Sequence, residues 1–230
     1  MGVKRTAIKR EVDLQIFTDW ITPGSRVLDL GCGRGILLEH LAQTKDVYAV
    51  GVDTDGDKVA SCVKRGVSAY QGDINDFLKE FPDQYFDWVV CSRTLTELSH
   101  PKIVLEEALR AGKRLAVGFV NYGFWLNRWF MLVSGTRVQN DVYPRPWYET
   151  RRANPVSVGD FERFCRDEQI EIYRRAFLSG DWHTPCRFWP DLLAGYALFE
   201  IGYSKQPPPA KQPEAAGETP PNAKKAENAA

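Results

Sequence analysis

The stretch Arg26-Val-Leu-Asp-Leu-Gly-Cys-Gly-Arg-Gly35 decides the fold of this chain. Its first half is a short apolar run that is typical of a buried strand, and its second half holds three glycines in five residues. Glycine adopts positive φ without strain and has no Cβ, so such a turn lets a ligand approach the backbone closely. Leu37, Leu38 and Leu41 follow at helical spacing. The pattern predicts a strand, a tight turn and a helix.

Short apolar runs and amphipathic segments then alternate along the chain. Strands are expected at 47–52, 67–71, 87–91 and 113–120, with helices between them at 55–65, 73–81 and 101–111. Ser157 and Asp160 form a capping box that predicts a later helix, and 197–203 is expected to be a closing strand. Strict alternation of strand and helix predicts a parallel sheet with helices on both faces. The predicted class is therefore α/β, a doubly wound Rossmann-like sheet.

Carboxylates stand at the ends of the first three predicted strands, where ligands of open α/β sheets bind. Asp53 comes twenty residues after Gly33, where its carboxylate can accept hydrogen bonds from both ribose hydroxyls of a nucleoside. Asp73 can accept from the exocyclic amine of adenine, and the next backbone N–H can donate to the ring. The third glycine comes one residue too early for the dinucleotide pattern G-x-G-x-x-G, so a nicotinamide dehydrogenase is a distant alternative.

Residues 27–35, Asp53 and Gly72-Asp73 resemble the successive cofactor motifs of class I methyltransferases. The resemblance implies a seven-stranded, mostly parallel sheet whose last strand is antiparallel. It also implies S-adenosylmethionine or S-adenosylhomocysteine as cofactor, with the glycines at its methionine part, Asp53 at the ribose and Asp73 at the adenine. Asp29 would approach the amino group through water, and Ser92 the sulfonium. The full set expected to bind cofactor is Asp29, Gly31, Cys32, Gly33, Asp53, Thr54, Gly72, Asp73, Ile74 and Ser92; no catalytic residue is assigned.

Further blocks outside this cofactor core resemble the MetW family of methionine-biosynthesis proteins. They span about residues 14–203 and include Gly51-Val-Asp53, Ser92-Arg-Thr-Leu95, Asn121-Tyr-Gly-Phe-Trp125, Trp147-Tyr-Glu-Thr150 and Phe188-Trp-Pro190. The resemblance implies that the chain partners homoserine O-acyltransferase and supports or regulates it. The alternative is an active methyltransferase that modifies a small metabolite. Its candidate acceptor pocket is Arg128, Tyr143, Trp147, Tyr148 and His183.

Several motifs have a second, structural interpretation. Asp29 and Asp73 could each cap the helix that follows, because Asp is favoured at that position. The aromatic stretch 119–148 could be core that covers the sheet edge, or a lid or docking face in which Trp125, Arg128 and Trp129 matter most. Residues 53–57 look like a calcium loop, but Lys64 stands where a bidentate Glu is required, so we reject it.

Composition narrows the class of protein further. The 30 basic and 30 acidic side chains balance, which gives no reason to expect nucleic acid or an anionic membrane as partner. Five scattered cysteines without a C-x-x-C pair argue against disulfides and zinc, and no metal site is expected. We find neither a signal peptide nor a membrane span, and expect a cytoplasmic protein. The expected domain is 1–205, followed by a disordered Pro/Ala/Lys-rich tail at 206–230.

Overall fold

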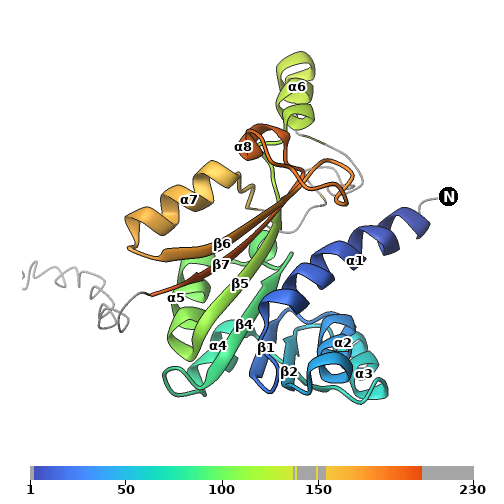
Figure 1. The fold of residues 1–230 in the computed structure, drawn as a ribbon, viewed down its shortest axis with the longest axis vertical. Helices are drawn as coiled ribbons and strands as arrows, with labels where there is room; N and C mark the ends of the chain where they lie inside the picture. Colours follow the sequence, from blue (N-terminus) through green and yellow to red (C-terminus); the bar gives the residue numbers. More distant parts are fainter. Residues whose placement is uncertain (1–2, 137, 139–148, 150–153, 204–230) are drawn as a thin grey trace, which may run out of the picture.

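The computed structural model describes residues 3–136, 138, 149 and 154–203 (Figure 1). The strands are β1 (Arg26–Leu30), β2 (Tyr48–Asp53), β3 (Ser68–Gln71), β4 (Phe86–Ser92), β5 (Gly112–Val120), β6 (Glu171–Leu178) and β7 (Tyr196–Gly202). They form a seven-stranded sheet in the order β3-β2-β1-β4-β5-β7-β6. Strands β1 to β5 pair in parallel, whereas β7 runs antiparallel to both of its neighbours. The predicted doubly wound α/β sheet, with its antiparallel last strand, is confirmed.

Helices cover both faces of the sheet (Figure 1). One face carries α1 (Val3–Trp20), α2 (Ile36–Lys45) and α3 (Gly56–Lys64), and the other carries α4 (Ile74–Lys79), α5 (Pro101–Ala111) and α7 (Val158–Asp167). Neighbouring residues of β1 alternate between the two cores, as strand geometry requires. Val27 packs in the core with Phe17, and Leu28 in the core with Leu105. This burial on both faces fixes the register of β1, and therefore the position of the glycine turn that follows β1 in the sequence.

The structure adds elements that the sequence pattern did not predict. Helix α1 and strand β6 are the main ones, together with α6 (Trp125–Ser134) and the short α8 (Pro190–Leu193). Strand β6 lies at the edge of the sheet and carries Arg174 and Arg175, so its sequence lacks the continuous apolar run of a central strand. The predicted capping box of α7 is present, because Ser157 Oγ accepts from Asp160 N at 3.1 Å.

Two expectations concern the ends and the surroundings of the chain. The tail at 206–230 and the domain boundary at 205 lie outside the described residues. Among the helices that the structure does describe, none has the length and apolarity to cross a membrane.

Candidate functional site

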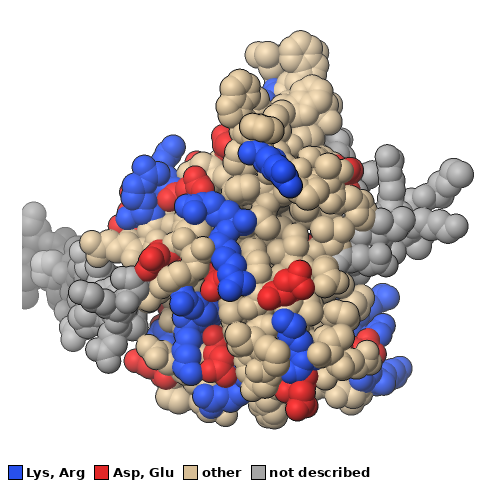
Figure 2. Space-filling model, viewed as in Figure 1, with Lys and Arg blue, Asp and Glu red and all other residues tan. Residues whose placement is uncertain are grey.

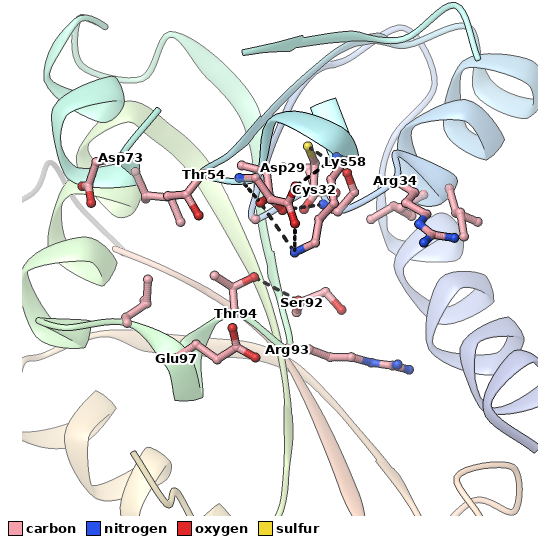
Figure 3. A pocket seen from close by; sticks show the side chains of 18 of the residues that line it. Asp29, Cys32, Arg34, Thr54, Lys58, Asp73, Ser92, Arg93, Thr94 and Glu97 are labelled. Atoms are coloured by element: carbon pink, nitrogen blue, oxygen red, sulfur yellow. Dashed lines mark hydrogen bonds and ion pairs between the residues drawn. The ribbon is translucent and has the colours of Figure 1, made fainter. Parts of the chain in front are cut away.

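The carboxyl ends of β1, β2 and β4 surround a cavity of about 880 Å³ (Figure 3). The sheet register explains this convergence, because Asp29 of β1 pairs with Gly51 of β2 and with Val90 of β4. Nine of the ten sequence-predicted site residues line the cavity, and Gly72 does not. In Figure 3, Asp73 and Arg34 lie at opposite ends of the cavity, with Asp29 between them. The strand-end residues therefore form one site.

The glycine turn after β1 has the backbone that only glycine adopts easily. Gly31 has φ +75° and Gly33 has φ +56°, both in the left-handed region. A Cβ at Gly31 would come 2.2 Å from Thr94 Oγ1, whereas a Cβ at Gly33 would meet no atom within 4 Å. Gly31 is thus required for packing, and Gly33 leaves open space on the side where a ligand would approach.

Asp53 ties the ends of the first two strands together. Its Oδ2 accepts from the Gly33 backbone N–H at 3.0 Å, and its Oδ1 accepts from Asp55 N at 3.0 Å. Lys58 Nζ lies 3.6 Å from Oδ1. The residue is 6% exposed and lines the cavity, and these contacts fix the orientation of its side chain before any ligand binds. Each carboxylate oxygen can accept more than one hydrogen bond, which leaves capacity for hydroxyl donors from the cavity.

Asp29 is buried at the centre of the site. Burial, reinforced by the negative charge of Asp53, raises the pKa of the Asp29 carboxyl to about 7. Helix α2 begins after Gly35 without a side-chain cap, so the alternative role of Asp29 as a helix cap is wrong. A carboxyl group with this pKa gains or loses its proton near neutral pH, and a cation beside it would favour the ionised form.

Asp73 has the capping role that the sequence allowed, and its position is compatible with the binding role. It is the N-cap of α4, where Oδ1 accepts from Asn75 N at 2.8 Å, so the capping interpretation is confirmed. It also lines the cavity together with Ile74. The binding of adenine by these two residues stays a prediction.

Cys32 lies within the glycine turn, between Gly31 and Gly33, and its side chain is buried. Its Sγ is 3.9 Å from Cys62 Sγ, and a Cβ on Gly51 would come 2.6 Å from it. Burial raises the pKa of the Cys32 thiol, which keeps it protonated and unreactive at neutral pH. Its backbone N–H donates to Val52 O at 3.1 Å, which links the glycine turn to β2.

An ion pair between Asp13 of α1 and Arg93 also lines the cavity, and sequence reasoning missed it. Arg93 Nη2 donates to Asp13 Oδ2 at 2.7 Å. Asp13 is 4% exposed, and its Oδ1 has no hydrogen-bond partner among the described residues. Burial raises the pKa of Asp13, although the Arg93 guanidinium opposes the shift. The sequence could have indicated Arg93 as a site residue, because it directly follows the end of β4. It could not indicate Asp13, because helix α1 was not predicted.

Arg93 is held in an unusual backbone conformation. Its φ of +64° is in the left-handed region, which is strained for a residue with a side chain. Its backbone N–H donates to Gly118 O at 2.7 Å, and its guanidinium lies 5.2 Å from the Trp182 ring centre and 5.5 Å from that of Tyr196. The Tyr196 hydroxyl is 3.4 Å from Ser92 Oγ. These contacts hold Arg93 and Ser92 at the carboxyl end of β4, where both line the cavity.

The cavity wall carries more negative than positive side chains. Its carboxyl groups are Asp13, Asp29, Asp53, Asp55, Asp73 and Glu97, and its cations are Arg34, Lys58 and Arg93. An excess of carboxylates in a partly desolvated pocket favours a ligand with positive charge. Neither Arg128 nor His183 lines this cavity, and Tyr143, Trp147 and Tyr148 lie outside the described residues.

A sequence model of a known family matches residues 11–201, and the family is described as "Methionine biosynthesis protein MetW". The chain belongs to the MetW family. A relative of this MetW chain is the bifunctional methionine biosynthesis protein MetXA/MetW of Rhodopirellula baltica, which is 30% identical over 125 residues. That alignment covers 51% of the chain but only 20% of the relative, so the chain spans about a fifth of the relative's length.

Other relatives are methyltransferases. The ubiquinone biosynthesis O-methyltransferase of Aeromonas salmonicida is 26% identical, over 58% of this chain and 61% of the relative. A methyltransferase from Archaeoglobus fulgidus that depends on S-adenosylmethionine superposes with a TM-score of 0.63 at 15% identity, over 86% of this chain and 93% of that one. Magnesium protoporphyrin IX methyltransferase of Synechocystis, solved with bound S-adenosylhomocysteine, gives 0.63 at 17% identity, over 87% and 86%. The MetW chain therefore has the fold of class I methyltransferases.

Proposed function

We propose that the cavity binds S-adenosylmethionine or S-adenosylhomocysteine. The observation that carries the proposal is Asp53, a fixed carboxylate at the tip of β2 that also holds the glycine turn through Gly33. In this arrangement Asp53 accepts from the ribose hydroxyls, and Asp73 and Ile74 receive the adenine. The open space at Gly33 and the unpaired Oδ1 of Asp13 fit a ligand with a cationic amino-acid end.

The remaining predicted residues have complementary roles in this proposal. Asp29 attracts the amino group of the methionine part, Gly31, Cys32 and Gly33 form its backbone cradle, and Thr54 borders the ribose next to Asp53. Ser92 stands near the sulfonium. Gly72 acts indirectly, because its backbone N–H donates to Asp53 O at 3.1 Å and so joins β3 to β2.

Calorimetric titration of the purified chain with S-adenosylmethionine tests this proposal. We expect saturable binding with one ligand per chain, and tighter binding of S-adenosylmethionine than of NAD. The purified chain must first show a cooperative unfolding transition, which establishes that it is folded. If such a chain then gives no heat of binding at millimolar S-adenosylmethionine, the proposed cofactor is wrong.

We further propose that the protein partners homoserine O-acyltransferase and adjusts its activity according to the cofactor that it holds. Two findings support the partnership: the MetW family is described by methionine biosynthesis, and one relative is a single bifunctional MetXA/MetW protein. S-adenosylmethionine is made from methionine, so its binding here would report on the product of the pathway. Such coupling requires that the cofactor bind the free and the partnered protein with different affinity. Turnover of the acyltransferase with and without this protein tests the partnership.

The second candidate is an active methyltransferase on a small metabolite, which the similarity to ubiquinone biosynthesis O-methyltransferases favours. Methyl transfer is an in-line displacement in which positioning supplies most of the rate enhancement, so a dedicated base is not required. Incubation with tritiated cofactor and a metabolite extract separates the candidates. Label transferred above background supports the methyltransferase, and its absence, alongside an effect on the acyltransferase, supports the partner protein.

A further inference from the structure

Helix α6 extends away from the body of the protein (Figure 1). Apolar side chains are exposed along its length. Trp129 is 59% exposed and Leu132 is 78% exposed, while Phe188 and Trp189, just before α8, are 79% and 76% exposed. We define the α6 patch as Trp125, Leu126, Trp129, Phe130, Met131, Leu132, Val133, Phe188, Trp189 and Leu193. On the face that Figure 2 shows, this end of the molecule carries few charged side chains.

Hydrogen bonds of Asn121 anchor the segment that leads into α6. Asn121 is fully buried, and its Nδ2 donates to the carbonyl oxygens of Pro190, Asp191 and Ala194. Its Oδ1 accepts from the backbone N–H groups of Gly123 and Val158. One satisfied amide thus joins the start of α6 to α7 and α8. A buried polar group with all its partners in place fixes one arrangement of the elements around it.

An ion pair joins α6 to α8 directly. Arg128 Nη2 lies 2.6 Å from Asp191 Oδ2, and Arg128 Nε donates to Gly123 O at 2.5 Å. Asp191 Oδ1 accepts from Gly159 N at 2.9 Å. The pair neutralises the one charged side chain of α6. Helix and loop are therefore held as one preorganised surface, which reduces the entropy lost when a partner binds.

The size of the α6 patch matches a protein interface. Taking about 200 Å² for one aromatic side chain, the exposed fractions of its five aromatic residues leave roughly 600 Å² accessible. The five aliphatic residues add to this, so the patch reaches the roughly 800 Å² that each partner buries in a standard interface. Its summed exposed area is larger than the largest apolar patch of a typical monomer, and large apolar patches mark interaction sites. Helices that lie on anionic membranes carry several Lys or Arg, which α6 lacks.

We propose that the α6 patch is the docking surface for homoserine O-acyltransferase, and that it fits an uncharged, apolar face of that enzyme. This inference rests on the proposed function, because the identity of the partner is taken from it. The choice of occupant is supported by the relative in which MetXA and MetW are parts of one protein. No residue of the α6 patch lines the cofactor cavity, so docking there leaves the cavity open to the cofactor.

The test compares an α6 variant with a matched surface variant in binding to the acyltransferase of the same organism. The α6 variant is Trp129→Ser with Leu132→Ser. The control is Val63→Ser with Ile103→Ser, at side chains that are 61% and 50% exposed on other helices. Both full-length variants are first checked for unaltered S-adenosylmethionine affinity and unaltered melting temperature. We expect the α6 variant to bind the acyltransferase at least tenfold more weakly than the unaltered chain, and the control to bind equally well.

The outcomes separate this inference from the proposed function. Equal affinity of the α6 variant and the unaltered chain overturns the docking site and leaves the partnership standing. Failure of the unaltered chain to bind the acyltransferase removes the partnership and this site with it. Analytical ultracentrifugation of the free chain tests self-association. If the unaltered chain dimerises, the α6 variant does not, and both bind the acyltransferase equally well, the patch binds a second copy of the chain. That result also overturns the inference.

Discussion

The carboxylate of Asp53 accepts a hydrogen bond from the backbone N–H of Gly33 at 3.0 Å, so the tip of β2 holds the turn that follows β1. The same side chain is the proposed ligand of the cofactor ribose. One residue therefore shapes the glycine cradle and contributes to binding. This double role makes Asp53 the most informative position for mutation.

Replacement of Asp53 by Ala is expected to weaken S-adenosylmethionine binding by about tenfold to a hundredfold. Hydrogen bonds to a charged acceptor contribute about 1.5–3 kcal/mol each, and a tenfold change corresponds to about 1.4 kcal/mol. Asp53→Asn keeps one oxygen acceptor and should bind with intermediate affinity. Isothermal titration calorimetry measures both, with the exposed Asp57→Ala as control. Unchanged affinity of Asp53→Ala would show that the ribose lies elsewhere.

Gly31→Ala is expected to destabilise the protein by about 2–5 kcal/mol. The added Cβ would overlap Thr94 Oγ1, and overpacking costs about 1–3 kcal/mol in addition to about 1–2 kcal/mol for a side chain at left-handed φ. Gly66→Ala is the control, because Gly66 has φ +77° and open space around it. Urea unfolding should therefore show a smaller loss for Gly66→Ala. Combining Gly31→Ala with Thr94→Ala should recover part of the loss, and full additivity would contradict the overlap.

The raised pKa of Asp29 predicts a specific dependence of stability on pH. The carboxyl has a pKa of about 7 in the folded protein and 3.8 as the reference value for the unfolded chain, so the folded state binds more protons between these values. The free energy of unfolding then falls as pH rises from about 4 to 7, by up to about 1.4 kcal/mol per unit of pKa difference.

Asp29→Asn removes this titration. Urea unfolding at pH 5 and pH 7.5 should show that the variant loses less stability across this interval than the unaltered chain. If the two proteins lose the same amount, Asp29 does not titrate in this range.

Arg93→Ala is expected to destabilise the protein by about 3 kcal/mol, because it leaves the buried Asp13 carboxylate without its cation. The double variant Asp13→Asn with Arg93→Ala removes the uncompensated charge as well. Its stability should exceed that of Arg93→Ala alone. Chemical denaturation of the two single variants and the double variant measures the coupling, and a coupling near zero would show that the pair contributes little.

Local pattern was enough to predict six of the seven strands, all but β6, and most of the residues that line the cavity. The apolar run of β1, its glycines and the carboxylates at Asp29, Asp53 and Asp73 are signals within single short segments. The Asp13–Arg93 pair joins residues 80 positions apart, and nothing local in the sequence marks it. Its prediction would have required the position of α1 against the sheet, which depends on the packing of Phe17 and Trp20.

The aromatic stretch after β5 shows a second limit of sequence reasoning. The core interpretation is right for Phe119, which is fully buried, and wrong for Trp129, which is 59% exposed. Amino-acid composition does not distinguish a buried apolar helix from an exposed one. The difference lies in how α6 is oriented relative to the body of the protein, and the hydrogen bonds of Asn121 help to fix that orientation. The docking-face alternative agrees with this exposure and rests on the test above.

The most direct test of the central claim is turnover of the homoserine O-acyltransferase from the same organism, measured with this protein and S-adenosylmethionine together and with each alone. We expect turnover to change several-fold when the protein is added, by an amount that depends on the cofactor. Asp53→Ala should abolish the dependence on the cofactor. Identical turnover with and without the protein, at concentrations where the cofactor is bound, would contradict the account and leave an independent methyltransferase as the function to pursue.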